Sequence, residues 1–133
     1  MSALSTGAEL GPNTFTITRA DLVRYAGASG DFNPIHWNDR IATMVGLPGV
    51  IAHGMFTMAL VASAVDEWAG AGRTVEFGGK FTNPVVVPDD DEGVQIEVSG
   101  KVGDVADGRA TIVLTVTCGG TKVLGMPKAV VRV

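Results

Sequence analysis

The sequence predicts an α+β fold in which an antiparallel sheet wraps around one long apolar helix. Two patterns lead to this prediction. Residues 50–65 are largely apolar and are followed by Asp66 and Glu67, which is short for a membrane span and typical of a buried helix. Residues 94–99 and 111–117 then alternate apolar with mostly polar side chains, the period of strands with one buried face. Helices followed by a run of strands are typical of an α+β domain.

The 133 residues suffice for one domain with its own core, spanning 1–133. A hydrophobic fraction of 46% is typical of a globular chain. A net charge of −4 and scattered Lys and Arg residues disfavour a nucleic-acid-binding surface. The single cysteine, Cys118, excludes an internal disulfide and any multi-cysteine metal site. The first residues carry no basic stretch or apolar signal region, so a cytoplasmic location is expected.

The N-terminal part of the chain is expected to contain little structure before its first helix. Residues 1–13 read as a weakly structured lead-in, with a short strand around residues 15–17. Thr18 and Asp21 are spaced as a capping box, in which each residue satisfies a backbone N–H of the other. A short helix should therefore start after Thr18 and run to Gly27.

A loop and a second short helix should follow. Residues 31–36 are expected to form the loop, since Asn33 precedes a proline and is biased away from helical backbone angles. Asn38 is placed to cap a helix over residues 39–45, with Gly46 just past its end.

The central helix should start near Ala52 or His53 and end between Trp68 and Gly70. Because it is apolar on nearly all sides, it should be wrapped by other structure. Tight turns are expected at Asp107-Gly108 and Gly119-Gly120, and a solvated turn at residues 89–92. Besides the two alternating segments, strands are expected at residues 74–81 and over a last strand formed by 122–124 and 129–133, interrupted near Pro127.

Asp31 and His36 are the candidate acid–base residues. They flank Pro34 on a stiff loop where neither is needed for a core. A histidine exchanges protons near neutral pH, and a carboxylate can hold and polarise a water molecule. An isolated pair of this kind is more often a turn aspartate and a hydrogen-bonded histidine. The sequence His53-Gly54 at the head of the apolar helix shifts the balance toward catalysis.

Three further residues have candidate supporting roles. The Gly54 N–H at a helix start can stabilise negative charge on a substrate oxygen, although packing or capping is an equally plausible reason for a glycine there. His53 is expected to be structural, bonding a backbone carbonyl, and Asn33 to fix the loop. A metal held by Asp31 and the two histidines is disfavoured, since their spacing matches no common ligand pattern.

Three segments resemble the MaoC-like hydratase/dehydratase family, which has the hot-dog fold, and the resemblance covers nearly the whole chain. They are Tyr25-Ala26-Gly27 with Ser29-Gly30-Asp31-Phe32-Asn33-Pro34-Ile35-His36, then Ala52-His53-Gly54-Met55, and Lys80-Phe81-Thr82-Asn83-Pro84-Val85. The resemblance implies that Asp31 and His36 hold one water and that the Gly54 N–H polarises a thioester carbonyl. It leaves open which of the two side chains is formally the base. Many relatives support the pair with a helix serine, but the matching position here is Ala62, followed by Ser63.

The resemblance further implies a hydro-lyase that interconverts trans-2-enoyl and (3R)-3-hydroxyacyl thioesters without a metal or other cofactor. The leading version is the catalytic subunit of a (3R)-hydroxyacyl-ACP dehydratase in fatty-acid elongation. The alternatives are a CoA-specific (R)-enoyl hydratase of fatty-acid, polyester or sterol metabolism, and a non-catalytic subunit that binds acyl chains or acts as a scaffold. Exposed strand edges and a high apolar fraction suggest an interface. The resemblance implies a homodimer, or a heterodimer with a homologous non-catalytic subunit.

Overall fold

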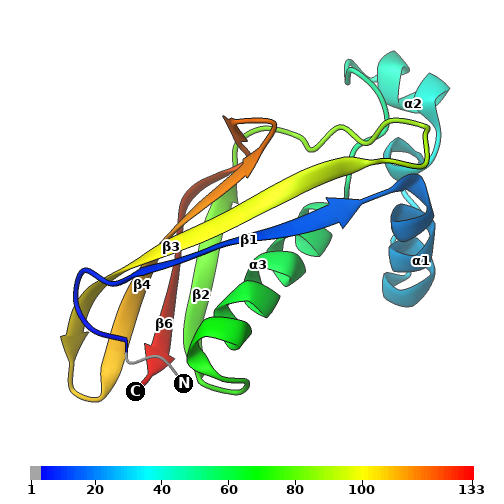
Figure 1. Ribbon diagram of the computed structural model, residues 1–133. Coiled ribbons are helices and arrows are strands. Elements are labelled where there is room, and N and C mark those ends of the chain that lie inside the picture. Colours follow the sequence, from blue (N-terminus) through cyan, green and yellow to red (C-terminus); the bar gives the residue numbers. More distant parts are fainter. Residues whose placement is uncertain (1–3) are drawn as a thin grey trace.

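One antiparallel sheet lies against one long helix in the computed structural model, which describes residues 4–133 (Figure 1). The strands follow the order β1-β3-β4-β6-β2, with β5 beside β4, so β1 and β2 are the two edges. The elements in chain order are β1 (Glu9–Ile17), α1 (Arg19–Ser29), the 3-10 turn η1 (Pro34–His36), α2 (Asp39–Met44), α3 (Gly54–Ala69), β2 (Thr74–Phe81), β3 (Val94–Ala106), β4 (Arg109–Cys118), β5 (Thr121–Lys122) and β6 (Leu124–Arg132).

The core lies between the inner face of the sheet and one face of α3. In the two segments with alternating sequence, the apolar positions Ile96 and Val98 of β3 and Ile112, Leu114 and Val116 of β4 are buried, as the alternation predicts. Val113, which interrupts the polar side of that alternation, points away from the core and is 57% exposed. The main contributors to the core are Val61, Ala64 and Val65 of α3 together with Ile96, Val98, Ile112, Leu114, Val116, Ala129 and Val131 of the sheet.

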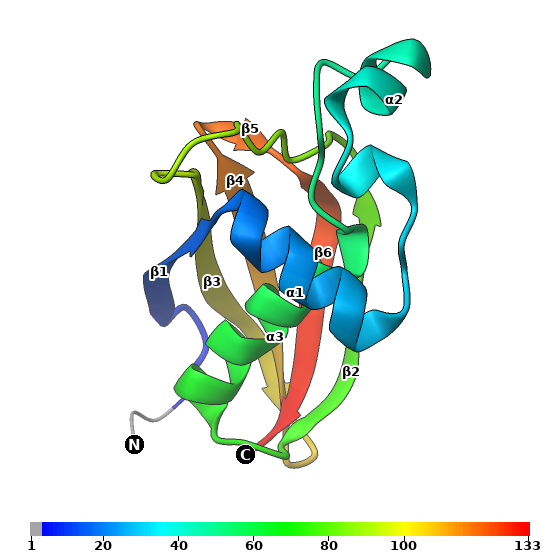
Figure 2. The same cartoon turned by 90° about the vertical axis from the view of Figure 1, so that its right-hand side faces the viewer.

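The predicted packing of an antiparallel sheet around α3 is confirmed, but the described residues leave one flank of this apolar helix uncovered. The sheet covers one side of the helix, and α1 crosses its N-terminal half (Figure 2). A ring stack between Tyr25 and Phe56, with centroids 5.1 Å apart, joins α1 to α3. The remaining flank of α3 is open, with Ser63 exposed and Met55 62% exposed. At 16 residues, α3 is too short to cross a membrane, and no helix within residues 4–133 meets the length and hydropathy that a span requires.

The N-terminal region is more ordered than its sequence suggests. The capping box is confirmed, because the Thr18 side chain accepts from the Asp21 N–H and the Asp21 carboxylate accepts from the Thr18 N–H. The helix α1 continues two residues beyond the expected Gly27 to Ser29. Residues 4–13 are not merely a lead-in, because β1 already begins at Glu9 and pairs with β3 along its length. Residues 1–3 lie outside the described part of the chain.

The segments around the second helix follow their sequence signals closely. Asn38 caps α2 by accepting from the Ile41 N–H, as predicted. The expected loop contains the single turn η1, because the Asn33 side chain accepts from the Ile35 N–H and so caps a turn that begins at Pro34.

The last strand breaks at a different place from the predicted one. The chain leaves the sheet at Val123, between β5 and β6, and β6 runs through Pro127 without interruption. Near Pro127 the pairing of β6 with β2 instead shifts by one residue, and Met126 has a positive φ of 47°. A β-bulge therefore accommodates Pro127. The proline has no N–H to donate, and it lies where the regular pairing of the strands is already interrupted.

Replacement of Ile112 by alanine should lower the free energy of unfolding by about 2–5 kcal/mol, since it removes a fully buried side chain from the sheet–helix core. The matched control is Val113→Ala on the same strand, which should change it by about 0.5 kcal/mol or less. Urea denaturation of both variants measures the difference. Equal losses in the two variants would contradict the assignment of the inner face.

Candidate active site

The extended segment of residues 50–52 is the backbone on which the site is assembled. Ile51 donates its N–H to the Ile35 carbonyl at 3.1 Å, and Ala52 donates to the Val85 carbonyl at 2.9 Å. The segment therefore ties the turn η1 on one side to the chain after β2 on the other. These two bonds fix the position of the Ile51 carbonyl. The carbonyl oxygen is not an acceptor in either bond, so it is available to another donor.

Asp39 anchors the same segment from α2. Its carboxylate accepts from the Val50 N–H at 3.1 Å and from the Arg19 guanidinium at 2.9 Å. These bonds lower the pKa of Asp39, the Val50 N–H contributing most and Arg19 next. Arg19 also donates through Nε to the Val87 carbonyl at 2.6 Å. A charged pair thus joins α1 and α2 to the segment that bears the site.

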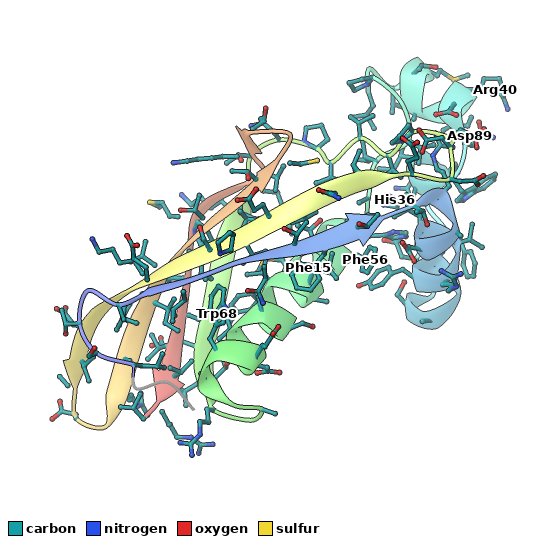
Figure 3. The ribbon with its side chains drawn as sticks, in the orientation of Figure 1. Phe15, His36, Arg40, Phe56, Trp68 and Asp89 are labelled. Carbon is teal, nitrogen blue, oxygen red and sulfur yellow. The ribbon has the colours of Figure 1, made fainter. Side chains whose placement is uncertain are left out.

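His36 is buried at the α1 end of α3 and is oriented by the Ile51 carbonyl (Figure 3). Its Nδ1 lies 2.7 Å from that oxygen. Because a carbonyl only accepts, Nδ1 carries the proton in the neutral ring, which leaves Nε2 with its lone pair free. Nε2 lies 4.0 Å from Oδ2 of Asp31.

The Asp31 carboxylate is held from its other oxygen. Oδ1 accepts from the Asn33 N–H at 3.1 Å, and the Asp31 side chain is 51% exposed. The distance of 4.0 Å from Oδ2 to His36 is too long for a direct hydrogen bond but suits one water that contacts both groups. The structure thus brings the two predicted acid–base residues together, with room for a small molecule between them.

His53 contacts both members of the pair, and its predicted bond to a backbone carbonyl is present. Its Nε2 lies 3.1 Å from the Asp31 carbonyl, and its ring stacks on His36 with centroids 3.8 Å apart. Burial lowers the pKa of His53, and the neighbouring His36 lowers it further, against the raising effect of the Asp31 bond. The ring is therefore neutral at pH 7, with Nε2–H as the donor. Its buried Nδ1 has no hydrogen-bond partner within residues 4–133.

Gly54 is the first residue of α3, just after the predicted start near Ala52 or His53, and it lines the cavity beside the pair. A helix has no internal acceptors for its first N–H groups, and its dipole makes this end positive. A Cβ atom at Gly54 would lie 2.8 Å from the Phe81 ring, closer than real contacts allow. A larger residue here would displace the end of the Phe81 ring, so a glycine suits this close approach of β2 in addition to any role of its N–H.

The pair opens into a cavity of about 530 Å³ whose wall is mainly apolar. Sequence reasoning missed several of its lining residues. Thr57 is buried and lies four residues after His53. This spacing places both residues on the same side of the helix start, and it is the sequence signal that could have identified Thr57 as a lining residue. Asn83 is fixed by a bond from its amide to the Lys122 carbonyl at 2.8 Å. The apolar lining residues include Ile51, Ala52, Met55, Phe81, Val85 and Leu124.

The helix serine of relatives has no counterpart at the pair. Ser63 is exposed, and its hydroxyl donates to the Ala59 carbonyl at 3.1 Å within the helix. Neither Ser63 nor Ala62 lines the cavity. The pair is held instead by Ile51, Asn33 and His53, and the Ser29 hydroxyl accepts from the Asp31 N–H at 3.2 Å.

A metal does not fit the donor atoms of Asp31, His36 and His53, although these lie within 4.8 Å of one another. An imidazole binds a metal in the plane of its ring, at about 2.0–2.1 Å for zinc. The two rings are stacked with an angle of only 22° between their planes. Because the ring centroids lie 3.8 Å apart and the planes are inclined by only 22°, the two planes do not meet close enough to the rings to share one ion at that distance.

The chain matches the family model described as MaoC like domain over residues 3–123. A curated relative, the 3-hydroxyacyl-thioester dehydratase X of Mycobacterium tuberculosis, is 44% identical over 72 residues, which is 54% of this chain and 25% of the relative. The chain thus spans only about a quarter of that relative's length.

Solved structures agree with this match. One described as a MaoC-like dehydratase is 38% identical with a TM-score of 0.92, over 96% of this chain and 40% of that chain. The (R)-hydratase from A. caviae involved in PHA biosynthesis has a TM-score of 0.85 at 22% identity, over 100% of this chain and 99% of that one. The HadBC (3R-hydroxyacyl-ACP dehydratase) complex of Mycobacterium tuberculosis has a TM-score of 0.68 at 17% identity, over 94% of each chain. At these low identities, the structural similarity to the last two proteins establishes only the fold of this chain.

The neutral state of His53 predicts a specific dependence of stability on pH. Below about 6.5, the usual pKa of histidine, the unfolded chain takes up a proton at His53 that the folded chain does not. The free energy of unfolding should therefore fall as pH drops below 6.5, by at most about 1.4 kcal/mol per pH unit for this one group.

The variant His53→Gln keeps an N–H donor but cannot titrate, so its stability should fall less steeply below pH 6.5 than that of the natural chain. Urea denaturation between pH 5 and 8 provides the comparison. Parallel curves for the two proteins would show that His53 has no lowered pKa.

Proposed function

The chain belongs to the MaoC-like domain family, and from this premise we propose that it is a hydro-lyase that interconverts trans-2-enoyl and (3R)-3-hydroxyacyl thioesters. The observation that carries the proposal is the pair formed by Asp31 Oδ2 and His36 Nε2, 4.0 Å apart at the wall of a largely apolar cavity. The sequence similarity to a 3-hydroxyacyl-thioester dehydratase supports the same reaction.

One water between the pair accounts for the chemistry. In hydration, the water oxygen bonds to C3 of the enoyl group while one of its protons passes to the pair. The pair then gives a proton to C2, so Asp31 and His36 end in the protonation states in which they began. Dehydration runs the same steps in reverse. Because the Ile51 carbonyl holds the proton of His36 on Nδ1, the exchange takes place at Nε2.

The start of α3 provides the complement to the pair. The Gly54 N–H is placed to donate to the thioester carbonyl as negative charge develops on it, with the positive end of the helix dipole behind it. Donors of this kind contribute about 3–4 kcal/mol to the stabilisation of a transition state. The apolar lining beyond Gly54 suits an acyl chain.

Within this reaction class, the favoured role is the catalytic subunit of a (3R)-hydroxyacyl-ACP dehydratase in fatty-acid elongation, acting in the cytoplasm as one domain over residues 1–133. The curated relatives support this role, since fatty acid synthase β subunits stand among them beside the thioester dehydratase. A CoA-specific (R)-enoyl hydratase is the second candidate, favoured by the full-length likeness of fold to an (R)-hydratase. A purely acyl-binding or scaffold role does not explain the assembled pair.

We further propose that the chain works with a second hot-dog subunit, either its own copy or a homologous non-catalytic chain. The open flank of α3 and the edge strand β2 lie beside the cavity, and two residues that line it, Met55 and Phe81, are 62% and 60% exposed. An apolar wall that is this exposed in the single chain is completed if a partner covers it.

The variants Asp31→Asn and His36→Ala should each reduce turnover in the hydration of crotonyl-CoA by about 10²-fold or more, as expected for a positioned acid–base group. The double variant should lose far less than the product of the two losses, because both residues act on one water. Loss of the conjugated-thioester absorbance measures the rates.

The exposed strand residue Asp104 supplies the control, since Asp104→Asn removes a carboxylate remote from the pair. Circular dichroism checks that each variant is folded. Near-normal turnover in a folded Asp31→Asn or His36→Ala variant would refute the proposed function.

Gly54→Ala keeps the backbone N–H but places a Cβ against the Phe81 ring. It should reduce turnover by up to about 10²-fold, because displacement at the site misaligns the substrate. Adding Phe81→Ala should recover part of the loss by making room. Failure of the second substitution to recover any activity would mean that the ring contact is not the cause.

Native mass spectrometry of the chain, alone and with candidate homologous subunits, should show a dimer. In a Phe81→Asp variant, the charge on the exposed edge should weaken the dimer. A monomer with full activity on long-chain substrates would contradict the proposal of a partner.

A further inference from the structure

Three arginines meet at the end of the molecule that lies opposite the catalytic pocket. The helix α3 starts in that pocket at Gly54 and runs for 16 residues, so its other end is about 24 Å away. There the loop before β2, the turn between β3 and β4 and the end of β6 together line a second cavity, of about 550 Å³. Its lining contains Arg73, Arg109 and Arg132.

Strand register places these arginines in one row. Arg109 of β4 and Arg132 of β6 are direct partners in the antiparallel ladder. Side chains of such partners project from the same face of a sheet with their Cβ atoms about 5 Å apart, where like charges are destabilising. On the other side of β6, the Arg132 N–H donates to the Arg73 carbonyl at 2.8 Å. Three neighbouring chain segments thus present a guanidinium to one cavity.

None of the three arginines forms a close ion pair within the described residues. Within residues 4–133, no carboxylate lies within 4.0 Å of a side-chain nitrogen of the three arginines. By contrast, Arg19 and Arg24 each lie 2.9 Å from an aspartate oxygen. Two carboxylates belong to residues that line the cavity, the side chain of Asp107 and the terminal carboxylate of Val133. Three arginines against two carboxylates leave the cavity with an excess of one positive charge in a chain whose net charge is −4.

One of the guanidiniums is already held in place. Arg132 donates through one Nη atom to the Gly72 carbonyl at 2.6 Å, which orients the group without cancelling its charge. A carbonyl bond of this kind leaves the other guanidinium N–H groups available, and these form a planar fork that matches the oxygens of a phosphate.

We propose that this cavity binds a phosphate group. An anion bound between Arg109 and Arg132 offsets the repulsion between their two positive charges. It also accepts hydrogen bonds from guanidinium N–H groups that have no carboxylate partner. The site is separate from the proposed catalytic function, because it lies at the opposite end of α3. The phosphate group is supplied either by inorganic phosphate or by a phosphorylated nucleotide.

Isothermal titration with inorganic phosphate, and separately with adenosine 3′,5′-bisphosphate, tests the proposal at constant ionic strength against chloride. One anion should bind per chain, and the two titrations distinguish the source. Arg109→Gln and Arg132→Gln should each raise Kd about tenfold or more, as expected when a charged hydrogen bond is lost. Lys128→Gln is the matched control, since it removes the same charge from an exposed position of β6 that does not line the cavity, and it should change Kd by less than about twofold.

Thermal unfolding gives a second readout that does not depend on heat of binding. Without phosphate and at low salt, Arg109→Gln should raise Tm because it removes the like-charge pair, and phosphate should raise Tm only in the natural chain and in Lys128→Gln. Arg109→Lys keeps the charge and the strand pairing, and it should still weaken phosphate binding because it lacks the fork. Phosphate that binds no better than chloride, or a loss in Lys128→Gln equal to that in the arginine variants, would overturn the proposal.

Discussion

The hydrogen bond between His36 Nδ1 and the Ile51 carbonyl, 2.7 Å long, is the interaction on which the candidate site depends. It decides which ring nitrogen holds the proton and therefore which one is free to face Asp31. The carbonyl itself is held by its neighbours, since Ile51 and Ala52 donate their N–H groups to opposite sides of the segment. Asp39 and Arg19 then fix that segment to both short helices. The acid–base pair is thus positioned by backbone groups, which do not change rotamer.

The two buried histidines have different roles. Burial lowers the pKa of His53, so its neutral ring serves as a fixed donor to the Asp31 carbonyl and stacks on the His36 ring. His36 presents Nε2 to the cavity, where it can exchange a proton. Because His53 immediately precedes α3, its bond to the Asp31 carbonyl places the aspartate loop next to the positive end of the helix. The groups proposed to transfer a proton and to stabilise charge are therefore brought together by these contacts.

Local signals in the sequence predicted much of this arrangement. The capping box at Thr18, the cap at Asn38 and the alternation along β3 and β4 depend on residues close in the chain, and all three are confirmed. The long-range features were not predictable in this way. The full length of β1 depends on its pairing with β3.

The same limit applies to contacts between distant elements. The close contact at Gly54 involves the Phe81 ring on β2, which is distant in the sequence. The row of arginines exists only because β4 and β6 pair in one particular register. The open flank of α3 was missed for a related reason, since the helix pattern shows that apolar faces must be covered but does not show whether the same chain covers them.

The central claim is that Asp31 and His36 activate one water at an acyl thioester. The most direct measurement is the hydration of crotonyl-CoA in D₂O by the purified protein in its native assembly, followed by mass and chiral analysis of the product. The account predicts (3R)-3-hydroxybutyryl-CoA with one deuterium at C2, because the pair delivers the proton that it takes from solvent. Recovery of unreacted crotonyl-CoA from folded protein, or a product of (3S) configuration, would contradict it.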